Sequence, residues 1–534
     1  MPGVSMSKRT KRTVFGSAAL LSIAALIAKV LSAFYRVPLQ NLAGDLGFYV
    51  YQQVYPLYGI GMTFALNGLP VFISRLVAEK TVAERPALVR QLRSILVGVS
   101  LAAFVGFQAA APWIAGAMGD QDLTSMIRAV SWMYLFMPTL ALGRGYYQGT
   151  LDMTPTAVSQ VVEQILRVAV IIWAAWYFHG HPAWTYYEMG TFAMSGATIG
   201  ALGAAWTLHR YRRRDPFWGT VHLATPDNSW RLLTRRLLLQ GGSICLFAAA
   251  LILFQLVDSF TVARSLQKIG YLPVAARSLK GIYDRGQPLV QLGLVLSSAF
   301  GTTLVPNLTR ALQSGSRLRI QRLATEVTHI SLLFSVAATG GLIALLPWIN
   351  QFLFGDREQL MTLALYLGAI ILVAMINTYN AILQSVGNYR AATYGLLIGI
   401  ALKAALTGPL IRIFGLPGAS LATLIGLAVV WWIIFNQLPS LIRISVSTRL
   451  FGTRLLGVTI PMMIATFMIA CASQAVLGVS RWASIGVTLI GIAAGVTIFL
   501  TLALRNKLLT IREWLVLPFG SGMLHLVQRL QRNK

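Results

Sequence analysis

Apolar runs of about twenty residues recur along the whole chain, and short polar connections separate them. A run of that length, folded as a helix, spans the ~30 Å hydrocarbon core of a bilayer. We expect an all-α polytopic membrane protein, since a membrane β-barrel would show short alternating segments instead. The pattern predicts fourteen transmembrane helices, at residues 14–36, 47–73, 94–112, 124–147, 157–178, 190–209, 237–258, 283–306, 325–348, 360–386, 392–413, 418–438, 455–477 and 482–503.

The eighth predicted span differs from the others because polar residues recur along it at helical spacing. Asp284, Gln287, Gln291, Ser298 and Thr302 are separated by 3, 4, 7 and 4 residues. That spacing places them on one face of a helix. Because a lipid-facing surface has no use for such groups, we expect this face to line a polar cavity.

The two halves of the chain repeat each other at a nearly constant offset. Matched positions lie 234 to 236 residues apart, as in Gly47, Tyr49 and Gln53 with Gly281, Tyr283 and Gln287, Pro112–Trp113 with Pro347–Trp348, and Gly119–Asp120 with Gly355–Asp356. Each half holds six spans in the same orientation, which is the parallel-repeat plan of many transporters. We expect a cytoplasmic N-terminus at 1–13, two pseudo-symmetric six-helix lobes at 14–209 and 237–438, a linker at 210–236, and two extra helices with a tail at 439–534.

Charge changes this picture by orienting the helices. The chain has 44 Lys and Arg against 16 Asp and Glu, and thirty of the 44 basic residues lie in the alternate connections that include both termini. The opposite connections hold six. By the positive-inside rule, we expect both termini to be cytoplasmic. The asymmetry accounts for the net charge, so we expect no nucleic-acid partner.

Charged residues within the predicted spans are the sharpest signs of a functional site. Lys29 and Arg36 share one face of the first span, Asp284 and Arg285 open the eighth, and Lys403 lies near the middle of the eleventh. Each buried charge costs roughly 2.5–3.5 kcal/mol near the bilayer centre. Basic residues outnumber acids in the spans, which favours an anionic ligand such as a phosphate or pyrophosphate.

Other polar residues in the spans suggest further contacts to a substrate or ion. Asp258, at the outer end of the seventh span, is a candidate ligand for a coupling ion. Asn377, Asn380 and Gln384 share one face of the tenth span and suit the hydroxyl and amide groups of a sugar, and equally suit hydrogen bonds between helices. Gln287 and Gln291, from the polar face of the eighth span, are further candidate contacts to the substrate.

The remaining features point away from catalysis. Glu163 and Arg167 are four residues apart and predict a structural ion pair along one helix. Both cysteines lie in apolar runs and predict neither a disulfide framework nor a metal site. Enzyme motifs such as a phosphate loop, HExxH or a nucleophile elbow are absent from the sequence. We therefore expect a non-enzyme without cofactors, coupled to Na+, H+ or the membrane potential.

Four segments resemble the polysaccharide-biosynthesis branch of the MOP transporter superfamily, and most closely its stage V sporulation protein B group: residues 35–58, 67–80, 281–310 and 384–392. That group includes MurJ-type lipid II flippases. The resemblance implies a bilobed, V-shaped fold that moves an undecaprenyl-pyrophosphate-linked oligosaccharide to the outer leaflet by alternating access. We expect a monomer in the bacterial cytoplasmic membrane, whose partners are this lipid-linked oligosaccharide and membrane lipids.

The resemblance also assigns residues. In MurJ-type proteins, basic residues of the first span and an Asp-Arg pair of the eighth carry the function, and here Lys29, Arg36, Asp284 and Arg285 match them. A further acid often follows in the eighth span of such flippases, where this chain has Gln287. The leading hypothesis is a flippase for lipid II, the peptidoglycan precursor. The alternatives are a flippase for another cell-wall or spore polysaccharide precursor, a cation-coupled multidrug exporter, a membrane glycosyltransferase and a structural scaffold.

Overall fold

The computed structural model describes residues 20–21, 23–28, 30–223, 230–295, 311, 316–385, 388–445 and 449–516. Within that part the chain is helical and contains no strand, so the predicted all-α fold is confirmed. Contacts group the chain into two compact units, Met1–Asp284 with Lys403–Gly415, and Arg285–Leu402 with Leu416–Lys534. The predicted lobes were defined by the sequence repeat, whereas these units are defined by contacts. The predicted lobe boundaries therefore stay a prediction.

Unit 1 is built from long helices joined by short turns. Its helices are α2 (Arg36–Thr63), α3 (Leu69–Glu79), α4 (Arg85–Met118), α5 (Thr124–Ser131), α6 (Met137–Gly149), α7 (Thr154–Gly180), α8 (Tyr186–Arg214), α9 (Phe217–Leu223), α10 (Trp230–Arg236), α11 (Gly242–Ala248), α12 (Ala250–Lys268) and α13 (Pro273–Asp284). The last part of α18, from Lys403, also belongs to it.

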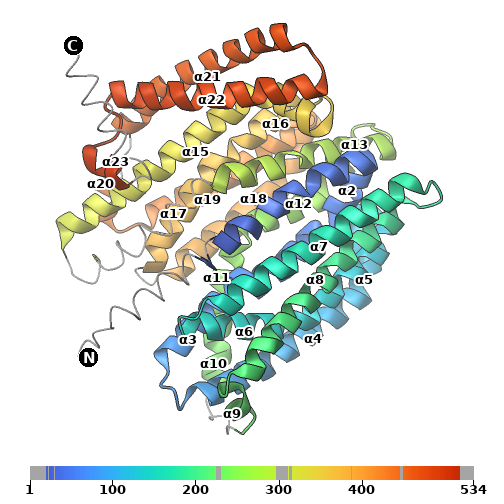
Figure 1. Cartoon of the computed structure of the whole chain (residues 1–534), viewed down its shortest axis with the longest axis vertical. Helices are drawn as coiled ribbons and strands as arrows, with labels where there is room; N and C mark the ends of the chain where they lie inside the picture. The colour runs from blue at the N-terminus through green and yellow to red at the C-terminus, as the bar shows by residue number, and fades with distance from the viewer. Residues whose placement is uncertain are drawn as a thin grey trace. The chain divides into compact units, whose positions relative to one another are not determined.

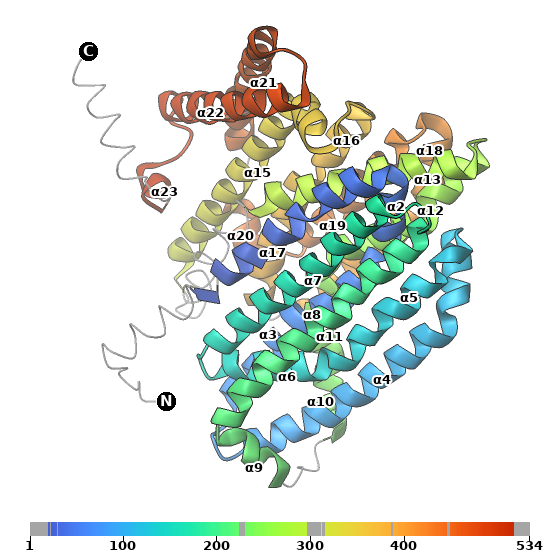
Figure 2. The ribbon, with the colours of Figure 1, turned by 45° about the vertical axis from the view of Figure 1, so that its right-hand side comes forward.

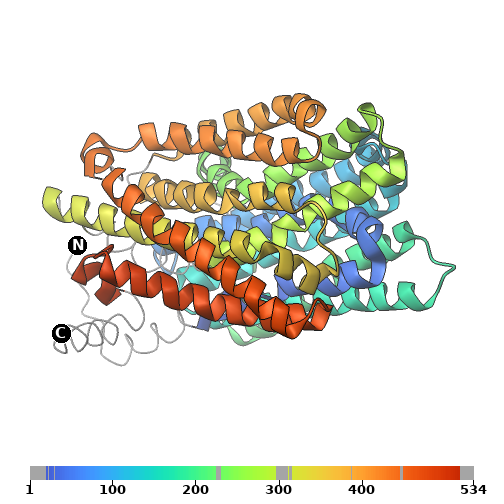
Figure 3. The ribbon, with the colours of Figure 1, turned by 90° about the horizontal axis from the view of Figure 1, so that it is seen from above.

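Unit 2 holds α15 (Arg317–Phe354), α16 (Leu360–Leu367), α17 (Ala369–Ser385), the first part of α18 (Tyr389–Phe414), α19 (Pro417–Asn436), α20 (Ser440–Ser445), α21 (Arg449–Leu477), α22 (Arg481–Arg505) and α23 (Ile511–Val516). Helices α21 and α22 match the two predicted extra spans. They meet at a short turn and both pack against α15 (Figures 1 and 3).

Ten helices of the described part are long and apolar enough to cross a membrane, and a pair bent by 69°, Trp230–Ala248 with Ala250–Lys268, adds an eleventh. One of the ten, Ile23–Glu79, is 57 residues long and covers the first two predicted spans. The predicted span at 190–209 falls in α8, which is 29 residues long but not among the ten. The eighth predicted span lies partly outside the described residues. The chain is a multi-pass membrane protein, for which fourteen spans is an approximate count.

A single glycine breaks the helix that covers the first two predicted spans. The predicted spans leave a connection at 37–46, in which residues 37–43 are helical and Gly44 leaves the helix, with φ 67° and ψ −176°. Residues with a Cβ rarely adopt these backbone angles, whereas glycine adopts them without steric cost. Gly44 therefore sets the bend between the two spans.

We expect Gly44→Ala to lower the free energy of unfolding by about 1–3 kcal/mol, because a Cβ strains the backbone at this φ even though it would meet no atom within 4 Å. Thermal unfolding of the purified protein in detergent measures the effect. Gly98→Ala is the matched control. Gly98 lies in the interior of α4 with equal space around it, so alanine there should be neutral or stabilising. Equal stability of the two variants would contradict the assignment.

Helices α7 and α8 lie side by side along their lengths because glycines of α8 let the backbones approach (Figures 1 and 2). A Cβ added at Gly200 would lie 2.7 Å from the carbonyl oxygen of Glu163, and one at Gly203 would lie 2.2 Å from the side chain of Leu166. Small residues at this interface explain why α8 is less apolar than its neighbours. They also hold the polar face of α7 in place.

The ends of α4 and α15 repeat one structure in the two units. Each helix contains a proline and ends at a left-handed glycine, Gly119 with φ 82° and Gly355 with φ 90°. An arginine from another helix donates to the last carbonyls in each case. Arg264 donates to Ala117, at 2.8 Å, and Arg481 donates to Phe352 and Leu353, both at 2.9 Å. The sequence repeat therefore has a counterpart in local structure.

Helix α23 is attached to the rest of unit 2 by the buried carboxylate of Glu513. Glu513 accepts hydrogen bonds from the Thr510 backbone at 2.7 Å, which caps the helix, and pairs with Nδ1 of His329 at 2.9 Å. The His329 ring stacks on Phe451 of α21. Burial alone would raise the pKa of Glu513, but the hydrogen bonds from His329 and Thr510 outweigh it and hold that pKa below its ordinary value.

We expect Glu513→Gln to destabilise the protein by about 1.5–3 kcal/mol near neutral pH, because the hydrogen bonds to a charged acceptor are lost. Since the folded-state pKa of Glu513 is lowered, its stabilisation is present above the unfolded-state pKa and disappears as the pH falls through the folded-state value. Thermal unfolding of both proteins across the acid range should show the gap closing. Glu79→Gln, at a carboxylate that is 58% exposed, should have little effect at any pH.

Candidate functional site

Two buried arginines of unit 1 lie against one group of tyrosine rings. Arg36 begins α2, and its guanidinium lies 4.7 Å from the ring centre of Tyr55 and 5.8 Å from that of Tyr35. Arg167, from the middle of α7, lies 4.4 Å from the ring of Tyr58 and 5.0 Å from that of Tyr35. Cation–π contacts with the shared ring bring the two positive charges into one cluster.

Arg167 keeps hydrogen-bonding capacity in this cluster. Its side chain is buried, and one NH2 group donates to Ser32 at 3.4 Å. Its Nε and other NH2 group make no hydrogen bond within the described part of the chain. An arginine does not lose its proton in a protein, and buried donors without acceptors are costly. The chemistry of this position therefore suits an incoming anion with several oxygens.

The predicted ion pair between Glu163 and Arg167 is wrong. Glu163 instead pairs with Arg144 of α6, at 2.6 Å, and both side chains are buried. Arg144 also reaches Ser159 and the carbonyl of Ala65, at 3.1 and 3.3 Å. Arg144 is the better partner because it approaches Glu163 from a neighbouring helix with all of its donors directed at acceptors. Arg167 is left to the tyrosine rings.

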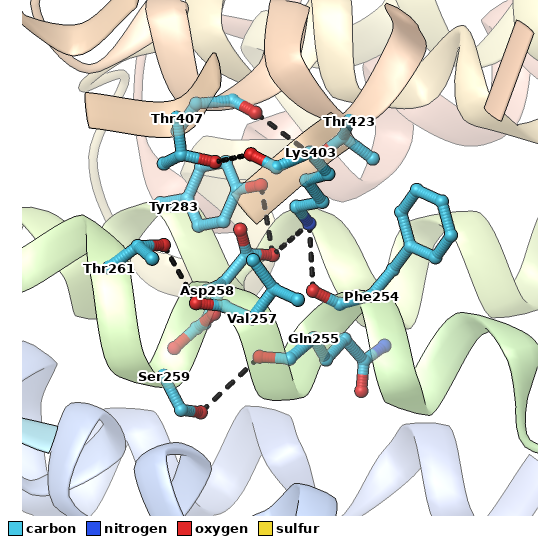
Figure 4. Close-up of polar contacts among 12 residues, drawn as sticks. Phe254, Gln255, Val257, Asp258, Ser259, Thr261, Tyr283, Lys403, Thr407 and Thr423 are labelled. Atoms are coloured by element: carbon cyan, nitrogen blue, oxygen red, sulfur yellow. Dashed lines mark hydrogen bonds and ion pairs between the residues drawn. The ribbon is translucent and has the colours of Figure 1, made fainter. Parts of the chain in front are cut away.

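A second buried cluster joins Asp258 of α12 to Lys403 of α18, within unit 1 (Figure 4). The ammonium of Lys403 lies 2.7 Å from Oδ2 of Asp258 and 2.8 Å from the carbonyl oxygen of Phe254. The hydroxyl of Tyr283 donates to the same carboxylate oxygen at 3.2 Å. Asp258, the predicted ligand of a coupling ion, is therefore paired with the ammonium of Lys403 in this structure.

The adjacent residues Asp284 and Arg285 have different partners. Asp284 ends α13 and pairs with Lys280 one turn earlier, at 2.5 Å. Arg285, assigned to unit 2, pairs with Asp356 at 2.8 Å and lies 5.0 Å from the ring of Phe354. Asp356 follows the glycine that ends α15. The pair therefore does not form one site by itself, and Arg285 would have to leave a carboxylate to bind a cargo anion.

The other predicted site residues are distributed in the following way. Gln287 and Asn380 are buried, Gln291 is half-buried, and Asn377 is exposed. Lys29 lies outside the described residues, as do Ser298 and Thr302 of the polar stripe. These residues stay predictions as a substrate-binding set.

Sequence reasoning missed three of the partners that shape these clusters: Arg167, Lys280 and Asp356. Arg167 was assigned to a local pair, although tyrosines at helical spacing in α2 give a signal for an aromatic face that can receive a cation. Asp356 could have been found from the repeat, since Gly119–Asp120 and Gly355–Asp356 match. Asp120 indeed binds an arginine as well, Arg277, at 3.2 Å.

Relatives of the chain cover nearly its whole length. The chain is 31% identical to the uncharacterized membrane protein YabM of Bacillus subtilis, over 97% of this chain and 98% of that protein. It is 26% identical to the lipid II flippase MurJ of the same organism, over 79% of this chain and 81% of that protein.

Solved structures share the fold. The inward closed conformation of the lipid II flippase MurJ matches with a TM-score of 0.67 at 12% identity, over 92% of this chain and 99% of that chain. An inward-facing multidrug resistance MATE family transporter of the MOP superfamily matches with a TM-score of 0.62 at 14% identity, over 79% of this chain and 96% of that chain. At such identities the likeness shows the fold alone.

The family model for polysaccharide biosynthesis proteins matches residues 15–312, more than half of the chain and the part that contains both arginines of the tyrosine cluster. The resemblance inferred from the four sequence segments is confirmed. The chain belongs to the polysaccharide biosynthesis protein family, and it shares its fold with the MurJ flippase and with a MATE family transporter of the MOP superfamily.

Proposed function

We propose that this protein is a flippase that moves an undecaprenyl-pyrophosphate-linked oligosaccharide, with lipid II as the cargo, from the cytoplasmic to the outer leaflet. The observation that carries the proposal is the pair of buried guanidinium groups, Arg36 and Arg167, on one tyrosine cluster. Two nitrogens of Arg167 lack hydrogen-bond acceptors in the described part of the chain. A pyrophosphate offers oxygens in the number and charge that these donors need.

The distribution of buried acids supports an anionic cargo over a cationic one. Each buried carboxylate of the helices of unit 1 lies on a basic side chain: Glu163 on Arg144, Asp258 on Lys403, and Asp284 on Lys280. A cation exporter needs carboxylates that a positively charged drug can reach. These carboxylates are already neutralised, so the multidrug alternative is less well supported.

We propose that the cycle alternates access to the tyrosine cluster, which is closed to solvent in this structure. The pyrophosphate would bind when the cluster opens to the cytoplasm, while the prenyl chain stays in lipid. If both termini are cytoplasmic, as the basic connections predict, an inside-negative potential favours outward movement of the anion by ~2.3 kcal/mol per charge per 100 mV. Asp258 and Lys403 are the proposed place where proton or ion coupling would act.

The test uses the purified full-length protein in liposomes, with fluorescent lipids that differ only in the headgroup. We expect flipping of lipid II, slower flipping of an undecaprenyl monophosphate and no flipping of a neutral undecaprenyl glycoside. A second pyrophosphate-linked oligosaccharide carried at an equal rate would place the specificity in the pyrophosphate rather than in the peptidoglycan sugars. Flipping of the neutral lipid at the rate of lipid II would refute the proposal.

A further inference from the structure

A cavity outside the tyrosine cluster lies at the end of unit 1 where α4, α6, α8 and α9 meet. Its volume is about 660 Å³, and its lining includes Arg93 of α4, Arg212 and Arg213 of α8, and Trp218 of α9. The one carboxylate of the lining, Asp215, accepts a hydrogen bond from the Phe217 backbone at 3.0 Å. Three guanidinium groups therefore share the cavity with a single carboxylate, which already accepts a backbone hydrogen bond.

Arg212 is held in place within this cavity. Its NH2 group donates to the carbonyl of Thr139 at 2.7 Å, and its guanidinium lies 4.1 Å from the ring centre of Trp218. Its Nε makes no hydrogen bond within the described residues. Burial lowers the pKa of Arg212 to about 10, and the charge of Arg93 acts in the same direction. Arg212 remains charged near neutral pH, next to like charges, with a donor to spare.

The other two arginines are open to ligands. Arg93 and Arg213 are exposed, and neither makes a hydrogen bond or ion pair in the described part of the chain. The lining also includes apolar side chains, here called the apolar wall: Val97, Leu135 and Leu142. A ligand that fits both the arginines and the apolar wall has an anionic head with several oxygens and a hydrocarbon part.

The residues beside the cavity are of the kinds found at a membrane interface. On the outer surface of the same end of α8, Arg210 lies 4.0 Å above the exposed ring of Trp206. Tryptophan rings with nearby arginines are typical of the headgroup region. This end also leads into the most basic predicted cytoplasmic connection, at 210–236. Basic pockets between helices on the cytoplasmic side are places where anionic lipid headgroups bind.

We propose that this cavity binds the phosphate of an anionic glycerophospholipid from the cytoplasmic leaflet, with Arg93, Arg212 and Arg213 around the phosphate and one acyl chain along the apolar wall. The site is separate from the proposed cargo cluster, and its ligand is a resident lipid rather than the transported one.

The experiment measures thermal unfolding of the full-length protein in nanodiscs of phosphatidylcholine alone and of equal parts phosphatidylglycerol and phosphatidylcholine. Native mass spectrometry counts the phosphatidylglycerol molecules retained by the same proteins in detergent. We expect phosphatidylglycerol to raise the unfolding temperature of the wild type. The variant Arg93→Gln with Arg212→Gln should lose this rise in unfolding temperature and should bind the lipid at least about tenfold more weakly. Should that variant fail to fold, Arg93→Gln with Arg213→Gln tests the same site at two exposed residues.

Arg210→Gln is the matched control, since it removes the same charge two residues from Arg212 but outside the cavity lining. It should keep both the thermal gain and the retained lipid. An equal loss in Arg210→Gln would overturn the proposal, because the effect would then be one of general surface charge. The proposal is also overturned if phosphatidylglycerol does not raise the unfolding temperature of the wild type. A rise caused instead by inorganic phosphate, in nanodiscs of phosphatidylcholine alone, would identify the ligand as a soluble phosphate.

Discussion

Lys403→Met should lower the free energy of unfolding by about 3–5 kcal/mol, one of the two largest stability losses that we expect from a single substitution in this protein. Methionine keeps most of the length of lysine but removes the ammonium. The carboxylate of Asp258 would then stay buried with only the hydroxyl of Tyr283 as a partner. An uncompensated charge in the interior costs far more than the ion pair itself contributes.

The control is a second substitution at the other end of the pair. Asp258→Leu added to Lys403→Met removes both charges and leaves two apolar side chains of similar size, so most of the lost stability should return. Thermal unfolding in detergent of the wild type, both single variants and the double variant gives the complete cycle. The account of this cluster fails if Lys403→Met unfolds at the wild-type temperature, or if the two losses simply add.

The second large effect concerns transport. Arg167→Gln should reduce the flipping rate of a pyrophosphate-linked lipid about 100-fold or more, because two charge-assisted hydrogen bonds to the cargo, each contributing about 1.5–3 kcal/mol, are lost. Stability should change little. The substitution gives up cation–π contacts with Tyr35 and Tyr58 but also removes buried donors that have no acceptors in the described structure.

Arg144→Gln provides the matched comparison, since Arg144 is also a buried arginine of unit 1. Its donors are occupied by Glu163, Ser159 and a backbone carbonyl. Removing it leaves the carboxylate of Glu163 buried and unpaired, so we expect a stability loss of about 3–5 kcal/mol. The two variants should therefore separate a structural arginine from a binding one. Equal unfolding temperatures for both would contradict that distinction.

The multi-pass helical fold could be predicted from the sequence because the bilayer imposes its thickness on every helix that crosses it. Apolar runs marked α21 and α22 to within about six residues at each end, and the predicted spans at 94–112 and 325–348 lie inside the longer helices α4 and α15. The sequence pattern placed a connection at 37–46 without giving its structure, and one glycine is enough to turn a helix there. The predicted span at 190–209 lies within helix α8, although the interface of α8 with α7 requires small residues in place of large apolar ones.

The candidate site was harder to predict because spacing describes only which residues of one helix can meet. Glu163 and Arg167 have the spacing of an ion pair, but spacing carried no information about Arg144 arriving from α6. Asp258 and Lys403 are separated by 145 residues, a contact that no local pattern contains. Asp284 and Arg285 are neighbours in sequence, yet α13 ends at Asp284 and Arg285 lies in the turn that follows, which lets each reach its own partner.

The most direct test of the central claim, that buried arginines receive the pyrophosphate of a lipid cargo, is the flipping rate of Arg167→Gln in liposomes, measured beside its unfolding temperature. The account predicts that lipid II flipping is lost while the unfolding temperature stays close to that of the wild type. Flipping at the wild-type rate by a well-folded Arg167→Gln protein would contradict the claim.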